Sequence, residues 1–267
     1  MNIINFYQYI CIELELDYFI NCNTKMVVME TMYETLLKMP LFQGLGEDEI
    51  TKIVGKVKLH FQKYKAGSVI LRSGDPCNEL TFLLKGEIML ESTDEDNNFV
   101  LKEFQSAPDL VGFYSLFGIK TCYFTTYTAE TDVDIVSIDK SFILTELDKH
   151  DIFRLNFRNI LSNRVQQFHD RLWQFTYSCL ETKIVDFLLA RCEKPYGKKQ
   201  LKIKMEDFAA IIGETRLSVS KCLNQLEKDG LVILRRTEVE IPELSVLKLW
   251  KEKFLMTFSH NKEIVNE

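Results

Sequence analysis

The amino-acid sequence predicts an α+β fold in three successive parts: an N-terminal double-stranded β-helix (a β-roll), a long dimerisation helix and a C-terminal winged helix-turn-helix. Three observations lead to this prediction. Short β-branched and aromatic segments alternate with glycine turns, an apolar heptad pattern follows them, and two helical patterns joined by a short turn precede a hairpin. With 267 residues, 46% of them hydrophobic, the chain is long enough for two small domains that each bury a core.

The first segment, residues 1–28, is an extension to which no structure is assigned. Acidic residues at positions 13, 15 and 17 interrupt its apolar residues, and either Met26 or Met29 fits as the first residue of the protein. From Met29 to Gly55 the pattern predicts two short helices around a Pro-Leu-Phe turn. The side chains expected to face inward there are Leu36, Leu37, Ile50 and Val54.

Short strands joined by tight turns are predicted from Lys58 onwards. The β-rich runs are residues 69–71, 80–84 and 88–90, and the turn signals around them are Gly67, Gly74-Asp75-Pro76 and Gly86. The acidic run 94–98 suits an exposed hairpin tip, and residues 121–139 close the set with alternating β-branched and aromatic positions. Short strands without intervening helices indicate a barrel or roll rather than a βαβ sheet.

Residues 141–178 are expected to contain the dimerisation helix. Its apolar residues are spaced 4, 3, 4 and 3 positions apart, the a/d rhythm of a coiled coil, and its other faces carry polar and charged residues. The seam consists of Leu161, Val165, Phe168, Leu172 and Phe175. Either the β-roll of the same chain or a partner helix can cover such a seam. The narrow stripe and the charged flanks favour a two-fold partner helix.

A helix-turn-helix is predicted within residues 179–242. A first helix is expected in the run KMEDFAAIIG, which ends at Gly213, and a second helix follows after a short turn. In the second helix Val219, Leu223 and Leu226 recur at helical spacing and face inward. A two-stranded hairpin is predicted in LVILRRTEVEIP, which makes the unit a winged helix, and residues 243–267 form a helical tail.

The outward side chains of the second helix have the chemistry of DNA recognition. Arg216 in its first turn can present two donors to the O6 and N7 atoms of a guanine, and Lys221 can reach a base edge or a phosphate. Serine hydroxyl groups can bond to phosphates, and two arginines lie at or near the hairpin tip. The predicted DNA-binding residues are Arg216, Leu217, Ser218, Ser220, Lys221, Arg235 and Arg236.

The charge distribution fits an anionic partner for the C-terminal part of the chain only. Residues 1–180 carry 17 Lys and Arg against 25 Asp and Glu, whereas residues 181–240 carry 12 against 10. The net charge of the whole chain is −6, which argues against a protein that binds nucleic acid with its entire surface.

Several functional classes are not expected. The seven cysteines are odd in number and contain no CxxC pair, and no secretory signal precedes them, which indicates reduced thiols in the cytoplasm. The apolar runs are too short to span a membrane, so no membrane partner is predicted. GxSxG, HExxH, Walker A and dinucleotide-binding glycine motifs are missing, and the chain is therefore not predicted to be an enzyme.

The motifs together resemble those of the Crp/Fnr superfamily of bacterial transcription regulators, from about Met29 to Pro242. The first half of that family's cyclic-nucleotide-binding β-roll is similar to YKAGSVILRSGDPCNELTFLLKGEIML, and its recognition helix is similar to IIGETRLSVSKCLNQLEKDGLV. The resemblance implies an effector-sensing domain over residues 29–140, a homodimer on a roughly palindromic site in double-stranded DNA, and RNA polymerase as a further partner. It also implies base and phosphate contacts for Arg216 and Lys221. Leu217 departs from the family pattern, since an acidic residue that accepts from cytosine N4 stands there in well-known members.

The resemblance also locates an effector pocket, and there the chain departs from the family again. Members that bind cyclic AMP hold its ribose with a Glu and its phosphate with an Arg, and the corresponding residues here are Phe113 and Tyr123. A buried phosphate without a guanidinium partner is unfavourable, so cyclic AMP is not expected to bind and the effector is unknown. The pocket either accepts an apolar or flat ligand or is filled by its own side chains. Its predicted residues are Gly112, Phe113, Tyr114, Ser115, Tyr123 and Phe124.

No metal site is predicted. Cys11 and Cys22 do not form the close cysteine cluster of the iron–sulfur members, and the four histidines lie in no haem-ligand motif. Redox sensing by Cys77 or Cys122 stays open as a further sensing mode. A cyclic-nucleotide-binding module that controls a partner protein is the alternative function, but it does not account for the winged helix.

Overall fold

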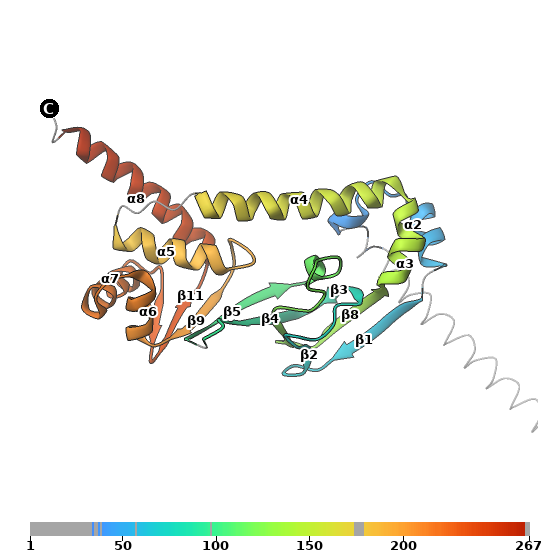
Figure 1. Ribbon diagram of the computed structural model, residues 1–267, viewed down its shortest axis with the longest axis horizontal. Coiled ribbons are helices and arrows are strands. Elements are labelled where there is room, and N and C mark those ends of the chain that lie inside the picture. The colour runs from blue at the N-terminus through green and yellow to red at the C-terminus, as the bar shows by residue number, and fades with distance from the viewer. Residues whose placement is uncertain are drawn as a thin grey trace, which may run out of the picture.

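The computed structural model describes Glu34, Leu37 and residues 39–56, 58–96, 98–173 and 179–264 (Figure 1). The predicted fold class is confirmed, since a roll of strands is followed by a long helix and a winged helix-turn-helix. The extension at residues 1–28 lies outside the described residues. Among the helices of the described part, none combines the length and the apolar character needed to cross a membrane.

The helical elements alternate with two groups of strands. The described helices, with short 3₁₀ turns labelled η, are η1 (Pro40–Phe42), α2 (Glu47–Val54), η2 (Phe113–Ser115), α3 (Lys140–Thr145), η3 (Leu147–Lys149), α4 (Asp151–Trp173), α5 (Leu180–Arg191), α6 (Met205–Ile212), α7 (Arg216–Lys228) and α8 (Leu244–Ile264). The described strands are β1 (Leu59–Tyr64), β2 (Val69–Leu71), β3 (Glu79–Lys85), β4 (Glu87–Thr93), β5 (Phe99–Ser106), β6 (Asp109–Val111), β7 (Thr126–Ala129), β8 (Val133–Asp139), β9 (Lys199–Ile203), β10 (Ile233–Arg235) and β11 (Glu238–Ile241).

The roll consists of two antiparallel sheets. One sheet has the strand order β1-β8-β3-β6, and the other contains β2, β7, β4 and β5. The three β-rich runs of the sequence lie in β2, β3 and β4, and the acidic run lies in the turn between β4 and β5, as predicted. The glycine turns and the β-rich runs locate these strands well, but consecutive strands do not always pair, since β3 pairs with β6 and β8 whereas β4 pairs with β5 and β7.

Strand β3 is buried on both of its faces, because one face lines the roll and the other packs against helical segments. The Phe42 ring of η1 lies 5.6 Å from the Phe82 ring of β3 and 5.9 Å from the Phe153 ring of α4. Leu37 and Ile50 pack in the same core, as predicted, whereas Leu36 and the side chain of Val54 lie outside what the structure describes. Aromatic packing thus fastens η1 and the start of α4 to the roll.

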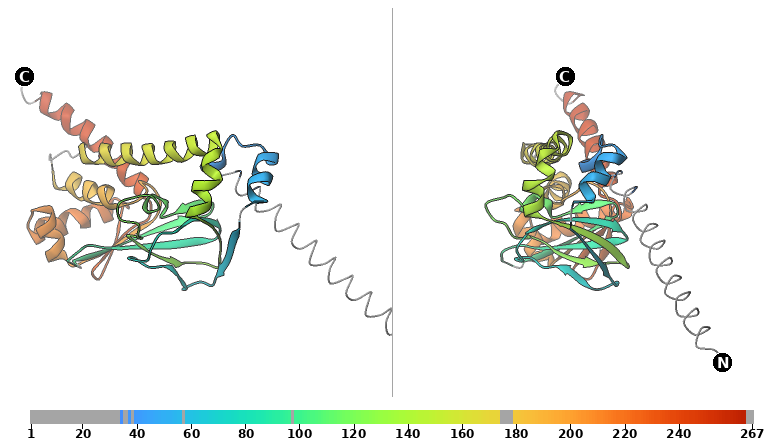
Figure 2. Two further views of the ribbon diagram at one scale, coloured as in Figure 1. Left: turned by 45° about the vertical axis from the view of Figure 1, so that its right-hand side comes forward. Right: turned by 90° about the vertical axis from the view of Figure 1, so that its right-hand side faces the viewer.

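The second sheet continues from the roll into the winged helix (Figure 1). Strand β9 pairs with β5 from Phe99↔Ile203 to Glu103↔Lys199, and on its other side β9 pairs with β11, which gives the order β10-β11-β9-β5-β4-β7-β2. Figure 2 shows the strands of the roll reaching the orange helices of the winged helix. No strand is predicted at β9, since its two lysines lower the β-propensity of so short a run and its partner lies far away in the sequence. The domain boundaries taken from the sequence stay a prediction.

Helix α4 runs along the roll toward α5 (Figure 1). Its first half is fixed to the roll, where the Asn156 side-chain amide donates to the backbone carbonyl groups of Leu41 at 3.2 Å and Gln43 at 2.8 Å. Its second half leaves Val165 66% exposed and Phe168 45% exposed. The roll of the same chain therefore does not bury these two predicted seam residues, although the Arg164 guanidinium lies over the Phe168 ring at 5.2 Å. The Leu172 side chain and Phe175 lie outside the described part of the chain.

Candidate functional site

The helix-turn-helix is built by α6, a turn at residues 213–215, and α7. Gly213 has φ +74°, a left-handed conformation that side chains other than glycine adopt only with strain, and this allows α6 to end sharply. Thr215 caps α7, because its hydroxyl oxygen accepts from the Ser218 backbone N–H at 3.1 Å. The buried face of α7 carries Val219, Leu223 and Leu226, as predicted, so the opposite face of the helix is presented to solvent.

The solvent-facing side of α7 carries the predicted DNA-binding residues. Arg216, Leu217 and Lys221 are exposed, whereas Ser218 and Ser220 are half-buried and Ser218 shares its hydroxyl group with the Thr215 cap at 2.8 Å. The guanidinium group of Arg216 lies 3.0 Å from the Glu206 carboxylate of α6, and both side chains remain exposed. An exposed pair of this kind is weak, so an incoming phosphate or guanine can displace Glu206 from Arg216.

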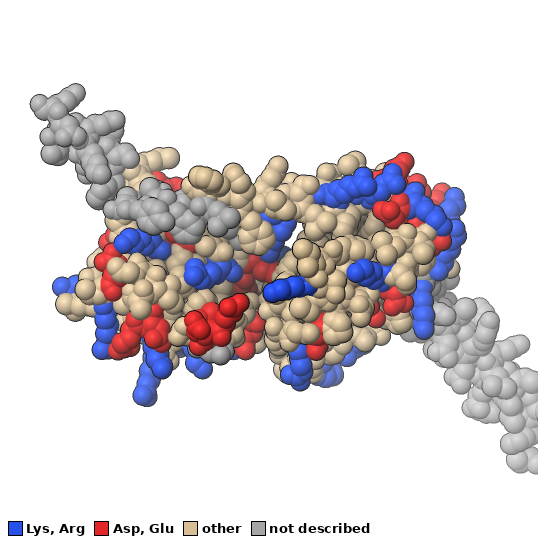
Figure 3. Space-filling model, in the orientation of Figure 1, with Lys and Arg blue, Asp and Glu red and all other residues tan. Residues whose placement is uncertain are grey.

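The wing is the β10–β11 hairpin, which turns at Arg236 and Thr237. Arg235 ends β10 and pairs with the Glu240 carboxylate at 3.2 Å, while Arg236 is exposed in the turn. On the face that Figure 3 draws, acidic and basic side chains are interspersed at the end formed by α6, α7 and the wing. On this face the surface therefore presents individual charged side chains of both signs rather than a broad positive field.

The predicted effector pocket lies beside η2 and is occupied by tyrosine rings. Gly112 has φ +55°, and a Cβ atom added to it would lie 2.7 Å from the Tyr123 ring, so only glycine permits this approach. Tyr123 is 3% exposed and its ring centroid lies 6.1 Å from that of buried Tyr127, in an edge-to-face arrangement. Burial raises the pKa of the Tyr123 hydroxyl above the ordinary value of a tyrosine.

The other predicted pocket residues differ in position. Phe113 is half-buried against Phe157, at 6.5 Å between ring centroids, and Ser115 is buried with no hydrogen-bond partner for its hydroxyl among the described atoms. Tyr114 lies between the roll and the winged helix, because its hydroxyl donates to the Glu193 carboxylate and also contacts the hydroxyl of buried Tyr127. Phe124 is 52% exposed, so the structure does not bring it together with Tyr123.

A polar cluster joins the roll to the winged helix, and we call Glu103, Tyr114, Arg164, Glu193 and Lys199 the interdomain cluster. Lys199 and Glu103 face each other across β9 and β5 at 2.9 Å, with side chains 1% and 5% exposed. The Glu103 carboxylate also accepts from the Glu193 backbone N–H at 2.7 Å. Arg164 of α4 lies 3.6 Å from the Glu193 carboxylate and donates to the Glu193 backbone carbonyl.

The charges of the interdomain cluster interact strongly with one another because they are largely removed from water. Burial raises the pKa of the Glu193 carboxyl, whereas the Tyr114 hydroxyl and the Arg164 charge act in the opposite direction. Breaking a buried pair leaves an uncompensated charge, so the roll and the winged helix are held in this arrangement by several groups at once. Tyr114 connects the two regions directly, since it belongs to η2 and bonds to the segment that follows α5.

The sequence did not indicate roles for Thr215, Glu206 or the interdomain cluster, of which only Tyr114 was predicted, as a residue of the effector pocket. The N-cap had a local signal, since a threonine directly before a helical pattern is a preferred cap. Glu206 and the cluster had none, because their partners come from other elements and only the fold brings them together. Neither Glu103 nor Lys199 differs by its neighbours in sequence from an ordinary surface residue.

Comparisons with known proteins agree with these two regions. Residues 61–150 match the family model of the cyclic nucleotide-binding domain, and residues 182–250 match that of the Crp-like helix-turn-helix domain. The chain is 24% identical to the cAMP-activated global transcriptional regulator Vfr of Pseudomonas aeruginosa, over 65% of this chain and 85% of that protein. It is 25% identical to the global nitrogen regulator of Synechococcus elongatus, over 76% and 91%, and 26% identical to the transcriptional regulator SdrP of Thermus thermophilus, over 69% and 91%.

Proposed function

Because the chain is a transcription regulator of the Crp/Fnr superfamily, with an effector-binding domain and a DNA-binding helix-turn-helix, we propose that it acts in the cytoplasm as a homodimer on an inverted-repeat DNA site. The matched helix-turn-helix family and the relatives are transcription regulators and not enzymes. This confirms the prediction, made from the sequence, that the chain is not an enzyme. The alternative of a nucleotide-binding module that acts only on a partner protein is not favoured, since residues 182–250 match a DNA-binding domain.

The exposed face of α7 is the observation that best supports this proposal. Its first turn holds Arg216 at the surface, where a guanidinium can donate to guanine O6 and N7, and Lys221 lies on the same helix for a base or a phosphate. Leu217 is 65% exposed and can only make apolar contacts, for which the methyl group of thymine is the natural partner. The wing arginines, Arg235 and Arg236, contact phosphates and set the register of the helix.

Dimerisation follows from the second half of α4. Val165 and Phe168 belong to a heptad seam and are exposed in the single chain, so a partner α4 related by two-fold symmetry covers them. Two α7 helices related by the same axis then face half-sites about 34 Å apart, one turn of duplex. RNA polymerase is the further partner that a regulator bound beside a promoter contacts.

Val165→Glu is expected to convert the dimer into monomers. The change places a carboxylate from each chain in the apolar seam, where burial of the two like charges weakens dimerisation by at least about 100-fold. Sedimentation velocity measures the change. Gln166→Glu, one position along and also exposed, adds the same charge away from the seam and is expected to leave the dimer intact. An unchanged dimer with Val165→Glu would remove α4 from this role.

The effector is proposed to act through η2. Tyr123 and Tyr127 fill the region beside Gly112, so a ligand that enters must move them. Cyclic AMP would have neither the Glu nor the Arg that holds it in the family members that bind it. A displaced η2 carries Tyr114 with it and loosens Glu193 in the interdomain cluster. The ligand then changes DNA binding only by as much as it prefers one arrangement of the domains over the other.

Selection from a random DNA library tests the proposed function. Sequences retained by the full-length chain are expected to share an inverted repeat with half-sites about one turn apart. Enrichment of a single unrepeated motif, or of no motif, would contradict a two-fold regulator. Retention of all sequences with equal affinity would reduce the role of α7 to phosphate contacts.

A further inference from the structure

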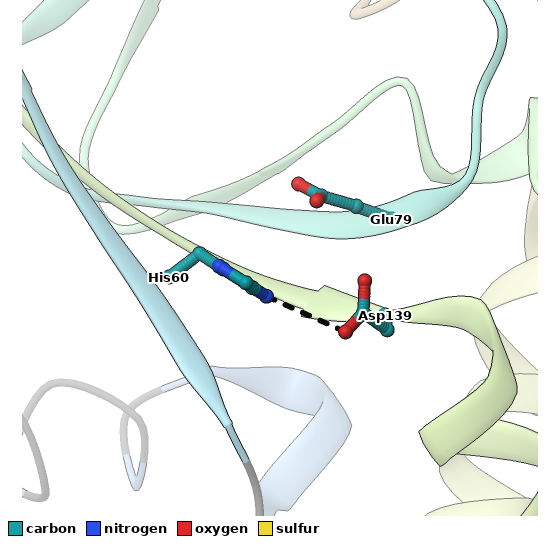
Figure 4. A group of neighbouring side chains, drawn as sticks. All are labelled: His60, Glu79 and Asp139. Carbon is teal, nitrogen blue, oxygen red and sulfur yellow. Dashed lines mark hydrogen bonds and ion pairs between the residues drawn. The ribbon is translucent and has the colours of Figure 1, made fainter.

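The sheet β1-β8-β3-β6 places three metal-binding side chains together outside the pocket and the DNA-binding surface. His60 lies on β1, Glu79 begins β3 and Asp139 ends β8. In the antiparallel register His60 is opposite Ser137, and Glu79 is opposite Asp139. Directly paired residues share a face of a sheet, as do residues two apart, so all three side chains project from the same face (Figure 4).

The distances suit a small cation. One ligand atom from each of the three residues lies within 4.8 Å of the other two, and His60 Nε2 is 3.4 Å from the Asp139 carboxylate. Two ligands that are each about 2.1 Å from a tetrahedral ion are themselves about 3.4 Å apart. The His60 and Asp139 side chains therefore need little movement to hold an ion, and Glu79 needs a small approach.

The surroundings support the three groups as ligands. Ser137, which is 2% exposed, donates a hydrogen bond from its hydroxyl to the Glu79 carboxylate. This bond orients the carboxylate, as hydrogen-bond partners of metal ligands commonly do. All three ligand residues are half-buried, with the side chains of His60 and Asp139 32% and 48% exposed. An ion can enter from solvent, and water can complete its coordination. Each ligand comes from a strand rather than a loop, so the backbone ladder holds their spacing.

We propose that His60, Glu79 and Asp139 form a binding site for a divalent first-row transition metal ion. One imidazole and two carboxylates suit Zn²⁺ or Mn²⁺, whereas Mg²⁺ and Ca²⁺ prefer oxygen ligands alone. Asp139 directly precedes α3, which leads through η3 to α4. A bound ion ties β1 and β3 to the residue from which this helical segment begins. The site escapes detection in the sequence because its ligands lie far apart and match no spacing motif.

Metal titration of the full chain, after removal of bound ions with a chelator, tests the site. Mn²⁺ is the first probe, because thiolates bind it poorly and the seven cysteines then contribute little. Electron paramagnetic resonance of free Mn²⁺ is expected to show one saturable site per chain, and nitrogen coupling to the bound ion should identify an imidazole ligand. Zn²⁺ is expected to bind at the same site and to bind more tightly.

Variants decide the assignment. His60→Gln and Glu79→Gln are each expected to weaken Mn²⁺ binding by about 100-fold, and Ser137→Ala by about tenfold. His60→Gln should also abolish the nitrogen coupling. Asp134→Asn, which changes a carboxylate on the opposite face of β8, is the matched control and should bind as the wild type does. Melting of each metal-free variant checks that it is folded. Absence of saturable binding below about 1 mM, or binding that His60→Gln and Glu79→Gln leave unchanged, would overturn the proposal.

Discussion

Arg216→Ala is expected to weaken binding to the selected inverted repeat by about 2–6 kcal/mol per dimer, because each guanine contact by an arginine contributes about 1–3 kcal/mol. Discrimination at the contacted base pair should fall as well, since alanine donates no hydrogen bond. Folding should be unaffected, as Arg216 is exposed and its one described ion pair, with Glu206, is a surface pair. Fluorescence anisotropy with the selected site and with its point variants measures both effects.

Two other variants separate this effect from a general loss of positive charge. Arg72→Ala removes an exposed arginine in the turn after β2 and is expected to leave DNA affinity unchanged. Lys221→Ala, if Lys221 contacts a phosphate, should weaken binding to all sequences alike and make it less dependent on salt. Wild-type affinity and specificity in the Arg216→Ala protein would mean that α7 does not read the DNA.

Lys199→Ala is expected to destabilise the protein by about 3–5 kcal/mol, because it leaves the Glu103 carboxylate buried without its cation. The pair joins β9 to β5, so the loss should appear first as faster hydrogen exchange of the amides in these two strands. Urea unfolding at fixed protein concentration measures the free-energy difference. DNA affinity should change as well, since the same pair holds the winged helix against the roll.

Lys198→Ala is the matched control for Lys199→Ala. The Lys198 side chain is 44% exposed and pairs with Glu240 at 3.3 Å, so removal of this lysine is expected to change the free energy of unfolding by less than about 1 kcal/mol. The double variant Glu103→Gln with Lys199→Met removes both charges together and should recover most of the loss. Equal stability of the Lys198→Ala and Lys199→Ala proteins would contradict the role given to the interdomain cluster.

Sequence patterns predicted the elements whose signals are local. The runs in β2, β3 and β4 are bounded by glycine turns, and the α6–α7 turn is marked by Gly213 between two helical patterns. Alternation of apolar residues records which face of an element is buried, but it does not record what covers that face. The heptad pattern of α4 therefore predicted a seam, and Val165 and Phe168 are exposed in the single chain, which is why we propose a partner helix as the cover.

The features that the sequence did not predict depend on contacts between distant segments. Strand β9 forms because it pairs with β5 and β11. A five-residue run with two lysines has little β-propensity of its own. A buried lysine such as Lys199 is indistinguishable in the sequence from a surface lysine until its carboxylate partner is located. The same holds for the group His60, Glu79 and Asp139, whose members meet only through the register of three strands.

We propose that two α7 helices of one dimer read two DNA half-sites on the same side of the duplex. Titration of the wild-type chain against DNA in which only the spacing between the selected half-sites varies tests it most directly. Affinity is expected to peak at a centre-to-centre spacing of about 10 base pairs and to fall by at least about 100-fold when about 5 base pairs are added, which turns one half-site to the opposite side. Affinity that does not depend on the spacing would mean that the two α7 helices do not bind the DNA together.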